Sequence, residues 1–204
     1  MPLILISCFD PFGGEPTNPS MELCERLPRD LGFATVETLL LPTSFARAPK
    51  ALLAAVDRLC PNAVLCLGQA GGRAALSLEK IGINWMQGRI ADNDGFQPEG
   101  GPILPGGPAA HFSTLPVEDM VLAVRQAGVP AELSFSAGAF VCNCLLYSLL
   151  QGLADRSLAL PAGFLHLPFT PAQAAAKPSA LPSMSLADME RGLRAALACL
   201  TGRL

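Results

Sequence analysis

The chain has 204 residues, of which 50% are hydrophobic and 15% are charged, and its formal net charge is −3. This size and composition predict a single domain over residues 1–204 with a large buried core, and the apolar content fits a further buried contact between subunits. The sequence has no basic run or patch, which argues against nucleic acid and acidic membrane surfaces as partners.

The cysteine content and the first residues indicate a cytoplasmic protein. There are 7 cysteines, an odd number without a repeating spacing, so reduced thiols are expected rather than a disulfide framework. Residues Met1 to Cys8 are apolar, but the run is short, has no basic flank and is followed at once by Asp10. It therefore predicts a core strand and not a secretion signal. No apolar run is long enough to span a bilayer.

The first predicted element is a strand from Leu3 to Cys8, a continuous apolar run typical of strands covered on both faces in a parallel sheet. A Gly- and Pro-rich loop from Phe9 to Ser20 follows, at the carboxyl end of that strand, where open α/β sheets place their sites. Its Gly-Gly pair has neither dinucleotide-binding spacing nor a following Lys-Ser/Thr, so it does not predict a phosphate site. Phe9 and Phe12 have two interpretations, ordinary packing or the walls of an apolar pocket.

Strands and a helix alternate in the next part of the chain. We predict a helix from Ala46 to Leu59 and strands from Phe33 to Leu41, Asn62 to Leu67 and Ala75 to Asn84. The second of these strands runs into a glycine-rich turn over residues 68–73. The third alternates apolar and polar residues, so Glu79 is either an inward-facing carboxylate or a solvated residue paired with a lysine.

The longest irregular stretch runs from Trp85 to Pro116. A segment of that length inside a compact domain is expected to be a lid, an interface arm or disordered. His111 lies in it, and a surface histidine is the simpler interpretation there. An amphipathic helix follows from Val117 and is closed by Gly128.

A strand, a tight turn and a helix are predicted around a pair of cysteines. Residues Ala131 to Phe135 form the strand, and apolar residues with helical spacing continue to Leu150. Cys142 and Cys144 lie in the first turns of this helix, where the dipole and the free backbone N–H groups favour an anion and are expected to lower a thiol pKa. Residues two apart point about 200° apart on a helix, so only one of the two faces a cleft. The alternative is that both are buried small hydrophobic side chains.

The last predicted elements are a strand from Gly163 to Phe169, a Pro- and Ala-rich surface loop to Pro182, and a helix that starts at Ser185 with Asp188 in a capping-box-like position. No internal repeat or linker interrupts the alternation of strands and helices. The pattern predicts an α/β fold with one mostly parallel sheet and helices on its faces.

Histidines are scarce, which limits the possible partners of a nucleophilic thiol. Such a thiol usually needs a base, and only His111 and His166 are available. His166 lies in an otherwise apolar strand, so it is either this base or a core histidine with a satisfied partner. The side chains that could orient its imidazole are Asp10, Glu79, Asp92 and Asp94, of which only Glu79 lies in a predicted strand. No cluster of His, Cys and acidic residues has metal-ligand spacing, so no metal site is predicted.

Six motifs lie in order along nearly the whole chain. They are Pro11-Phe12-Gly13-Gly14-Glu15 with Asn18-Pro19-Ser20, Leu67 to Arg73, Glu79-Lys80-Ile81 with Ile83-Asn84, Arg89-Ile90 with Asp92-Asn93, Ala137-Gly138 with Phe140-Val141-Cys142-Asn143, and Gly163 to Pro168. Together they resemble the pyroglutamyl-peptidase I family, also called pyrrolidone-carboxylate peptidase.

The resemblance implies a three-layer α/β sandwich of the phosphorylase/hydrolase-like type, with a mostly parallel or mixed central sheet. It implies a cysteine exopeptidase, an omega peptidase, that removes an N-terminal pyroglutamyl residue from peptides through a thioester acyl-enzyme, without a metal or cofactor. The Cys-His-Glu triad of the family falls on Cys142, His166 and Glu79. A homodimer or homotetramer is expected.

The pyroglutamyl group is a small neutral lactam, so its pocket needs apolar walls and a few hydrogen-bond partners. The resemblance places the walls at Phe9, Phe12, Phe140 and Val141. We assign substrate positioning and oxyanion stabilisation to Gln69 and Arg89, with the Cys142 backbone N–H as a further donor. Asn18 is expected either to hold the loop that carries Phe12 or to serve a simple turn.

The chain departs from many members of the family at Phe135-Ser136 and at Ala91, neither of which is a triad position. Two competing interpretations remain. One is a non-catalytic binding module that kept the fold, and the other is a nucleoside phosphorylase-like enzyme, which the absence of a convincing phosphate-site motif disfavours.

Overall fold

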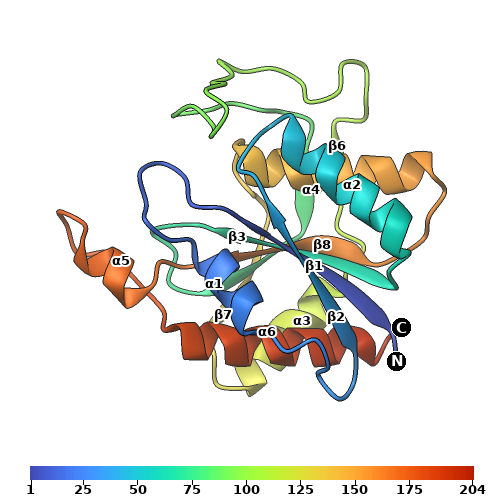
Figure 1. Cartoon of the computed structure of the whole chain (residues 1–204), viewed down its shortest axis with the longest axis vertical. Coiled ribbons are helices and arrows are strands. Elements are labelled where there is room, and N and C mark those ends of the chain that lie inside the picture. The colour runs from blue at the N-terminus through green and yellow to red at the C-terminus, as the bar shows by residue number, and fades with distance from the viewer.

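A six-stranded sheet runs through the middle of the molecule, described here by a computed structural model of residues 1–204 (Figure 1). Its strands lie in the order β2 (Thr35–Leu41), β1 (Leu3–Phe9), β3 (Ala63–Gln69), β8 (Ala162–Leu167), β4 (Leu76–Glu79) and β7 (Ala131–Ser134). All neighbours pair in parallel except β4 and β8, which are antiparallel. The mostly parallel or mixed sheet that was predicted is thereby confirmed.

Helices cover both faces of this sheet and complete a three-layer sandwich (Figure 1). One face carries α1 (Pro19–Arg26), α3 (Val117–Gln126) and α6 (Leu186–Thr201), and the other carries α2 (Arg47–Leu59) and α4 (Val141–Asp155). Successive residues of a strand point to opposite faces, so Ile4 and Ile6 of β1 belong to the first core and Leu5 to the second. Burial on both sides explains why β1 reads as an unbroken apolar run.

The segment Ala75 to Asn84 forms two strands rather than the single one predicted. After β4 the chain leaves the main sheet at Lys80, and β5 (Ile81–Ile83) pairs antiparallel with β6 (Ala110–Phe112) in a separate two-stranded sheet. Gly82 lies directly against α4, where an added Cβ would come within 3.0 Å of the Tyr147 backbone nitrogen. The alternation of apolar and polar residues continues through Lys80, so the pattern gives no sign of this change of sheet.

Two short helices occupy segments in which no helix was predicted. Helix α1 follows the first loop, and α5 (Pro171–Ala175) lies in the Pro- and Ala-rich segment and projects from the body of the molecule in Figure 1. Each has an N-cap side chain, Asn18 or Thr170, followed by a proline in the first turn. This cap-proline pair is a start signal for a helix, even one too short to show periodicity. None of the helices is long and apolar enough to cross a membrane.

The sheet topology brings several loops to one edge. Strands β1, β3 and β8 run in parallel, so the residues that follow Phe9, Gln69 and Leu167 lie together. The antiparallel pairing of β4 with β8 places Ser77 opposite His166 and Glu79 opposite Phe164. The first turn of α4, which contains Cys142, lies at the same edge of the sheet.

Candidate active site

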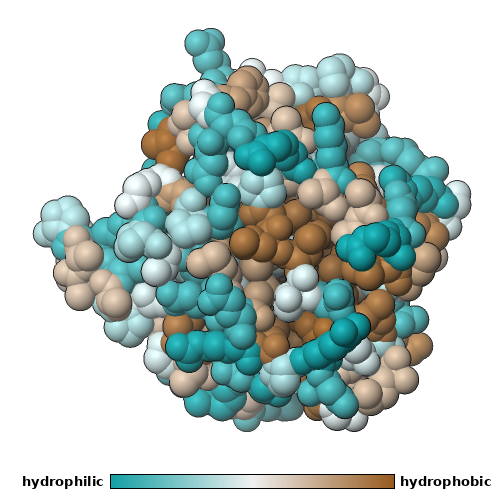
Figure 2. Space-filling model, in the orientation of Figure 1, coloured by the Kyte–Doolittle hydropathy of each residue, from teal (hydrophilic) through white to brown (hydrophobic).

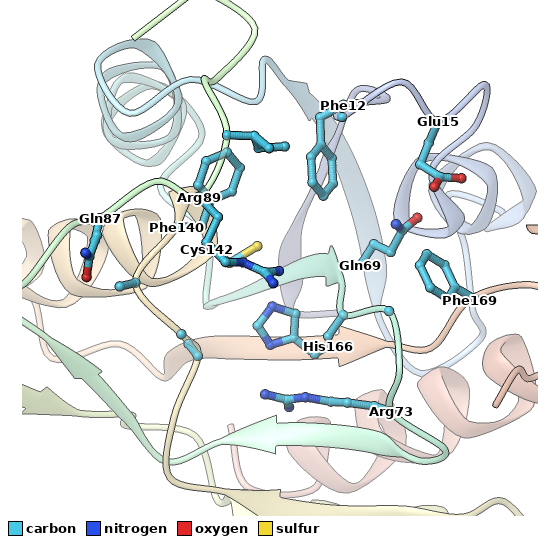
Figure 3. A pocket seen from close by; sticks show the side chains of 17 residues that line it. Phe12, Glu15, Gln69, Arg73, Gln87, Arg89, Phe140, Cys142, His166 and Phe169 are labelled. Atoms are coloured by element: carbon cyan, nitrogen blue, oxygen red, sulfur yellow. The ribbon is translucent and has the colours of Figure 1, made fainter. Parts of the chain in front are cut away.

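A cavity of about 730 Å³ lies at this edge of the sheet and is lined by 17 residues (Figure 3). Its walls come from the loop after β1, the turn after β3, the segment around Arg89, the turn before α4, and the end of β8. Cys142 and His166 both line it, and Figure 3 shows the thiol and the imidazole on the same side of the cavity.

Cys142 is the second residue of α4, which begins directly on the sheet. Gly138, with φ +78°, turns the chain ahead of the helix. A Cβ at Gly68 of β3 would lie 3.0 Å from the Cys142 sulfur and 2.7 Å from the Phe164 ring, so only glycine lets the thiol approach the strand. Cys144 points elsewhere, because it is 3% exposed and its thiol donates to the Phe45 carbonyl oxygen at 3.7 Å. The prediction that only one of the two cysteines faces a cleft is confirmed.

His166 has the partner that a polar side chain on an apolar strand requires. Its Nδ1 lies 2.7 Å from Oε1 of Glu79, and both side chains are buried. This bond occupies Nδ1, which leaves Nε2 for the cavity. The geometry is that of an imidazole oriented by a carboxylate.

Arg73 is a further member of this cluster that sequence reasoning did not single out. Its Nη1 donates to the same Glu79 Oε1 at 2.8 Å, and its Nη2 donates to the Ser136 carbonyl oxygen at 2.9 Å. Lys80, by contrast, pairs with Glu118, so Glu79 is not the solvated partner of a lysine. A guanidinium in a glycine-rich turn at a strand end was the available signal for Arg73. Because Arg73 contacts a backbone carbonyl, the departure at Ser136 leaves this bond intact.

Electrostatics in the cluster favour neutral Cys142 and His166 beside a charged Glu79. Burial raises the pKa of the Cys142 thiol to about 12, with further contributions from the charge of Glu79 and from Cys66. Burial also lowers the pKa of His166, and this effect outweighs the opposing effect of Glu79. Burial opposes ionisation of Glu79, but its pKa is lowered because hydrogen bonds with His166 and Ser134 and the charges of His166 and Arg73 together outweigh that burial.

The prediction that the helix terminus lowers the thiol pKa of Cys142 is therefore wrong in this structure. The backbone N–H of Cys142 does favour the thiolate, but loss of solvent on the cavity floor and the nearby carboxylate act more strongly in the opposite direction. A thiol in these surroundings needs a base in order to react.

The remaining acidic candidates hold loops and do not contact His166. Asp10 accepts from the Thr43 backbone N–H at 2.6 Å, and Asp92 accepts from the Phe45 backbone N–H at 2.9 Å. Asp94 pairs with Arg47. The other histidine, His111, bonds to Gln151 at 2.8 Å on the flank of α4 and does not line the cavity.

Two of the four predicted wall residues line the cavity. Phe12 and Phe140 lie side by side in its wall, with ring centroids 5.9 Å apart. Phe9 and Val141 are 2% and 1% exposed and do not line it, which corrects the expectation for them. Phe9 packs against Phe164 in the core, at 6.5 Å between centroids, because its position on β1 directs its ring into the sandwich.

Both predicted polar contacts, Gln69 and Arg89, line the cavity, and Figure 3 shows the Arg89 guanidinium pointing toward Cys142 and His166. Glu15, Gln87 and Phe169 also line it and were not predicted. Asn18 donates to the Asp10 carbonyl oxygen at 3.1 Å and caps α1, so it does hold the loop that carries Phe12. No three His, Cys, Asp or Glu side chains are grouped so that they could hold a metal ion.

Comparison with known proteins agrees with this geometry. The sequence profile of the pyroglutamyl peptidase family matches residues 3–202. Pyrrolidone-carboxylate peptidase of Levilactobacillus brevis is 48% identical over 95% of this chain and 95% of its own length, and that of Escherichia fergusonii is 46% identical over 97% and 92%. The crystal structure of pyroglutamyl peptidase I from Bacillus amyloliquefaciens superposes with a TM-score of 0.94 at 37% identity, covering 98% of this chain and 95% of the other.

Proposed function

The chain belongs to the pyroglutamyl peptidase family, a hydrolase family that removes amino-terminal pyroglutamate, and from this premise we propose that Cys142, His166 and Glu79 carry out the reaction. The observation that carries the proposal is the 2.7 Å hydrogen bond between Glu79 and His166 on the cavity wall that also bears Cys142. Nucleophile, base and orienting carboxylate are the groups that acyl transfer from an amide requires.

The first half-reaction acylates the thiol. The Cys142 sulfur attacks the carbonyl carbon of the pyroglutamyl group while His166 Nε2 takes the thiol proton, so a C–S bond forms and the carbonyl oxygen becomes an oxyanion. The oxyanion accepts hydrogen bonds from Arg89 and from the Cys142 backbone N–H. The C–N bond then breaks, and the amine of the shortened peptide leaves with the proton held by His166.

The second half-reaction releases pyroglutamate. Water attacks the thioester and His166 accepts its proton; the C–S bond then breaks, and His166 returns the proton to the departing sulfur to restore the Cys142 thiol. Glu79 keeps its charge throughout and holds Nδ1 of the imidazole, so that Nε2 carries each proton in turn. Arg73 donates to the same Glu79 oxygen and helps to hold the carboxylate in place.

The cavity suits a small neutral lactam. Phe12 and Phe140 provide apolar surface above and beside the thiol, and Gln69 and Arg89 provide hydrogen-bond donors. Phe45 supports the wall from behind, since its ring meets Phe140 edge to face at 5.2 Å. The proposed substrates are peptides with an amino-terminal pyroglutamyl group.

The test is release of a fluorescent amine from a pyroglutamyl amide, run beside the matching prolyl and glutamyl amides, with and without a thiol reductant and a chelator. We expect cleavage of the pyroglutamyl amide alone, dependent on the reductant and unaffected by the chelator. If folded, reduced protein cleaves none of the three amides, a non-catalytic binding module becomes the better account.

Self-association stays a prediction. Figure 2 shows apolar side chains gathered along the middle of one face, over the edge strand β2 and the neighbouring α2, where Leu40 is 54% exposed. The two-stranded β5–β6 sheet also carries Phe112, which is 64% exposed. Both features are consistent with contact between subunits.

A further inference from the structure

The amide of Gln173 lies buried behind the cavity and is fully engaged. Gln173 is the third residue of α5 and is 4% exposed. Its Oε1 accepts from the Thr170 backbone N–H at 3.0 Å, which closes the capping box of that helix. Its Nε2 donates to Gln69 Oε1 at 2.8 Å and to the Thr17 carbonyl oxygen at 3.2 Å, and it lies 3.4 Å from Glu15 Oε2.

These partners fix which way the amide points. If the Gln173 amide were turned over, its NH₂ group would face the Thr170 N–H, and its oxygen would face the Thr17 carbonyl and the Glu15 carboxylate. The turned-over amide would thus place a donor against a donor at Thr170 and an acceptor against acceptors at Thr17 and Glu15, and neither contact is a hydrogen bond. The surroundings therefore allow only the orientation in which Gln173 offers an N–H to Gln69.

The orientation of Gln69 follows from that of Gln173. Its Oε1 is occupied by the Gln173 N–H. Its Nε2 has no acceptor within the protein, and the only buried side-chain polar atoms without a partner are Ser7 Oγ and Glu79 Oε2, so Gln69 Nε2 is open to the cavity. In Figure 3 the Gln69 amide lies at the cavity wall, next to Glu15 and Phe169.

We propose that Gln173 is a positioning residue that holds Gln69 with its amide N–H groups toward the substrate, so that the site accepts a lactam carbonyl oxygen. This inference rests on the proposed function and concerns how the same cavity recognises its substrate. A prolyl group has a methylene where pyroglutamyl has this carbonyl, so a prolyl substrate leaves the Gln69 donor without a partner. A site built to donate a hydrogen bond discriminates strongly against a group that cannot accept one.

The same amide ties three segments into one wall. It joins the end of β3, the loop that carries Phe12, and α5. Lys177 adds to this junction, since it pairs with Glu15 and lies 4.9 Å above the centre of the Phe169 ring. Gln173, which does not line the cavity, thereby fixes the orientation of a hydrogen-bond donor that does, the Gln69 amide.

The test is a double-mutant cycle on kcat/KM for the pyroglutamyl amide, with Gln173→Met, Gln69→Met and the double variant. Each single variant is expected to lose about 10-fold, the scale of one hydrogen bond to substrate. The double variant is expected to fall no further than Gln69→Met, because Gln173 acts through Gln69. Gln173→Glu keeps the shape and in its ionised form offers only acceptors, so at alkaline pH it is expected to lose at least as much as Gln173→Met.

Thr170→Ala is the matched control, because it removes the capping hydroxyl of α5 and its long 3.4 Å contact with Gln173 Oε1, but keeps the Thr170 backbone N–H and the Gln173–Gln69 bond. We expect it to lower the Tm and to change kcat/KM by less than about twofold. If the losses of the two single variants multiply in the double variant, or if Gln173→Met and Gln173→Glu match the wild type, the inference is wrong. A wild-type protein that cleaves no pyroglutamyl amide would instead overturn the proposed function on which it rests.

Discussion

Glu79 uses one oxygen atom for two partners, His166 and Arg73. The guanidinium supplies a fixed positive charge next to the carboxylate, so His166 does not need to be protonated to compensate the buried negative charge. The imidazole is thus available as a base, and the pKa of His166 lies below its usual value. The Cys142 thiol, with its pKa of about 12, is protonated at neutral pH.

The first expectation at this scale concerns pH. We expect kcat/KM for the pyroglutamyl amide to rise with pH through an ionisation below 6.5, the ordinary value for histidine, and then to remain level through neutral pH. The direction follows because the proton acceptor is neutral His166, whose pKa is lowered. A profile that keeps rising to about pH 8.5, where a free thiol ionises, would show that thiolate formation limits the reaction instead.

The second expectation concerns Arg73→Met. Loss of the guanidinium raises the pKa of both Glu79 and His166, because Arg73 lowers both. We expect kcat/KM to fall by about 10- to 100-fold and the acid limb of the pH profile to move to higher pH. Lys80→Met is the control, since Lys80 pairs with Glu118 and does not line the cavity. An unmoved acid limb in Arg73→Met would argue against the role given to Arg73.

Candidate site residues could be predicted from the sequence where the chain has few residues of the required type. With two histidines in the chain and one of them on an apolar strand, His166 stood out, and the motif order pointed to Cys142 and Glu79. Arg73 and Gln173 were not singled out, because the contacts that give them their roles, such as the bond from Gln173 to Gln69 104 positions away, are formed only by the fold. The thiol pKa was mispredicted because burial cannot be read from a helix start.

At the scale of elements, the residue next to the proposed nucleophile joins α4 to the two-stranded β5–β6 sheet. Asn143 is 1% exposed, and its Oδ1 accepts from the Ile83 backbone N–H at 2.9 Å. Its Nδ2 donates to the carbonyl oxygens of Ile83 and Trp85 at 2.9 and 2.8 Å. The Asn143 amide thereby hydrogen-bonds three backbone groups at and just after the end of β5, which is not part of the main sheet.

We therefore expect Asn143→Ala to reduce the free energy of unfolding by about 2–4 kcal/mol, because it leaves buried backbone groups without partners. Urea unfolding followed by circular dichroism measures the change. Gln151→Ala, on the half-buried flank of the same helix, is the control: it removes side-chain hydrogen bonds to His111 and Asp155 but leaves no buried backbone group unpaired, so we expect it to change stability by about 1 kcal/mol or less. A similarly small effect at Asn143 would mean that other contacts mainly hold the β5–β6 sheet against α4.

The elements that the sequence predicted well are those with a long or unbroken pattern. The strand β1 and the helices α2, α3 and α6 follow from apolar runs or helical spacing, and Ser185 caps α6 as expected. The break at Lys80 and the helices α1 and α5 were missed for a common reason. A three- to eight-residue element is shorter than the window that periodicity needs, and its identity is decided by caps and by tertiary contact.

At the scale of the whole molecule, two cores share one sheet. The strands β1, β3 and β8 contribute side chains to both cores, so neither layer of helices can separate without exposing the other side of the same strands. The N-terminal strand lies inside the sheet between β2 and β3, and α6 packs on α3 and α1. The two ends of the chain are thus tied into a common structure.

From this arrangement we expect residues 1–204 to unfold as one cooperative unit. Far-ultraviolet circular dichroism reports the helices, and the fluorescence of Trp85, the only tryptophan, reports the segment after β5. The two signals are expected to share one midpoint in urea. Separate midpoints would show that the segment around Trp85, or one layer of helices, unfolds independently.

The fold class could be predicted from the alternation of strands and helices, but the strand order could not. Connections that return a parallel strand to its neighbour follow a general handedness rule. No local sequence signal predicts that β4 lies between β8 and β7, antiparallel to β8, because both partner strands follow it by more than 50 residues. That placement of β4 is what sets Glu79 within reach of His166.

The most direct test of the central claim compares wild type, Cys142→Ser and Cys144→Ser in the release of fluorescent amine from a pyroglutamyl amide, with folding checked by circular dichroism. We expect Cys142→Ser to lose at least about 10³-fold in kcat/KM and Cys144→Ser to stay within about threefold of wild type. Retained activity in folded Cys142→Ser, or an inactive but folded Cys144→Ser, would contradict the assignment of Cys142 as the nucleophile.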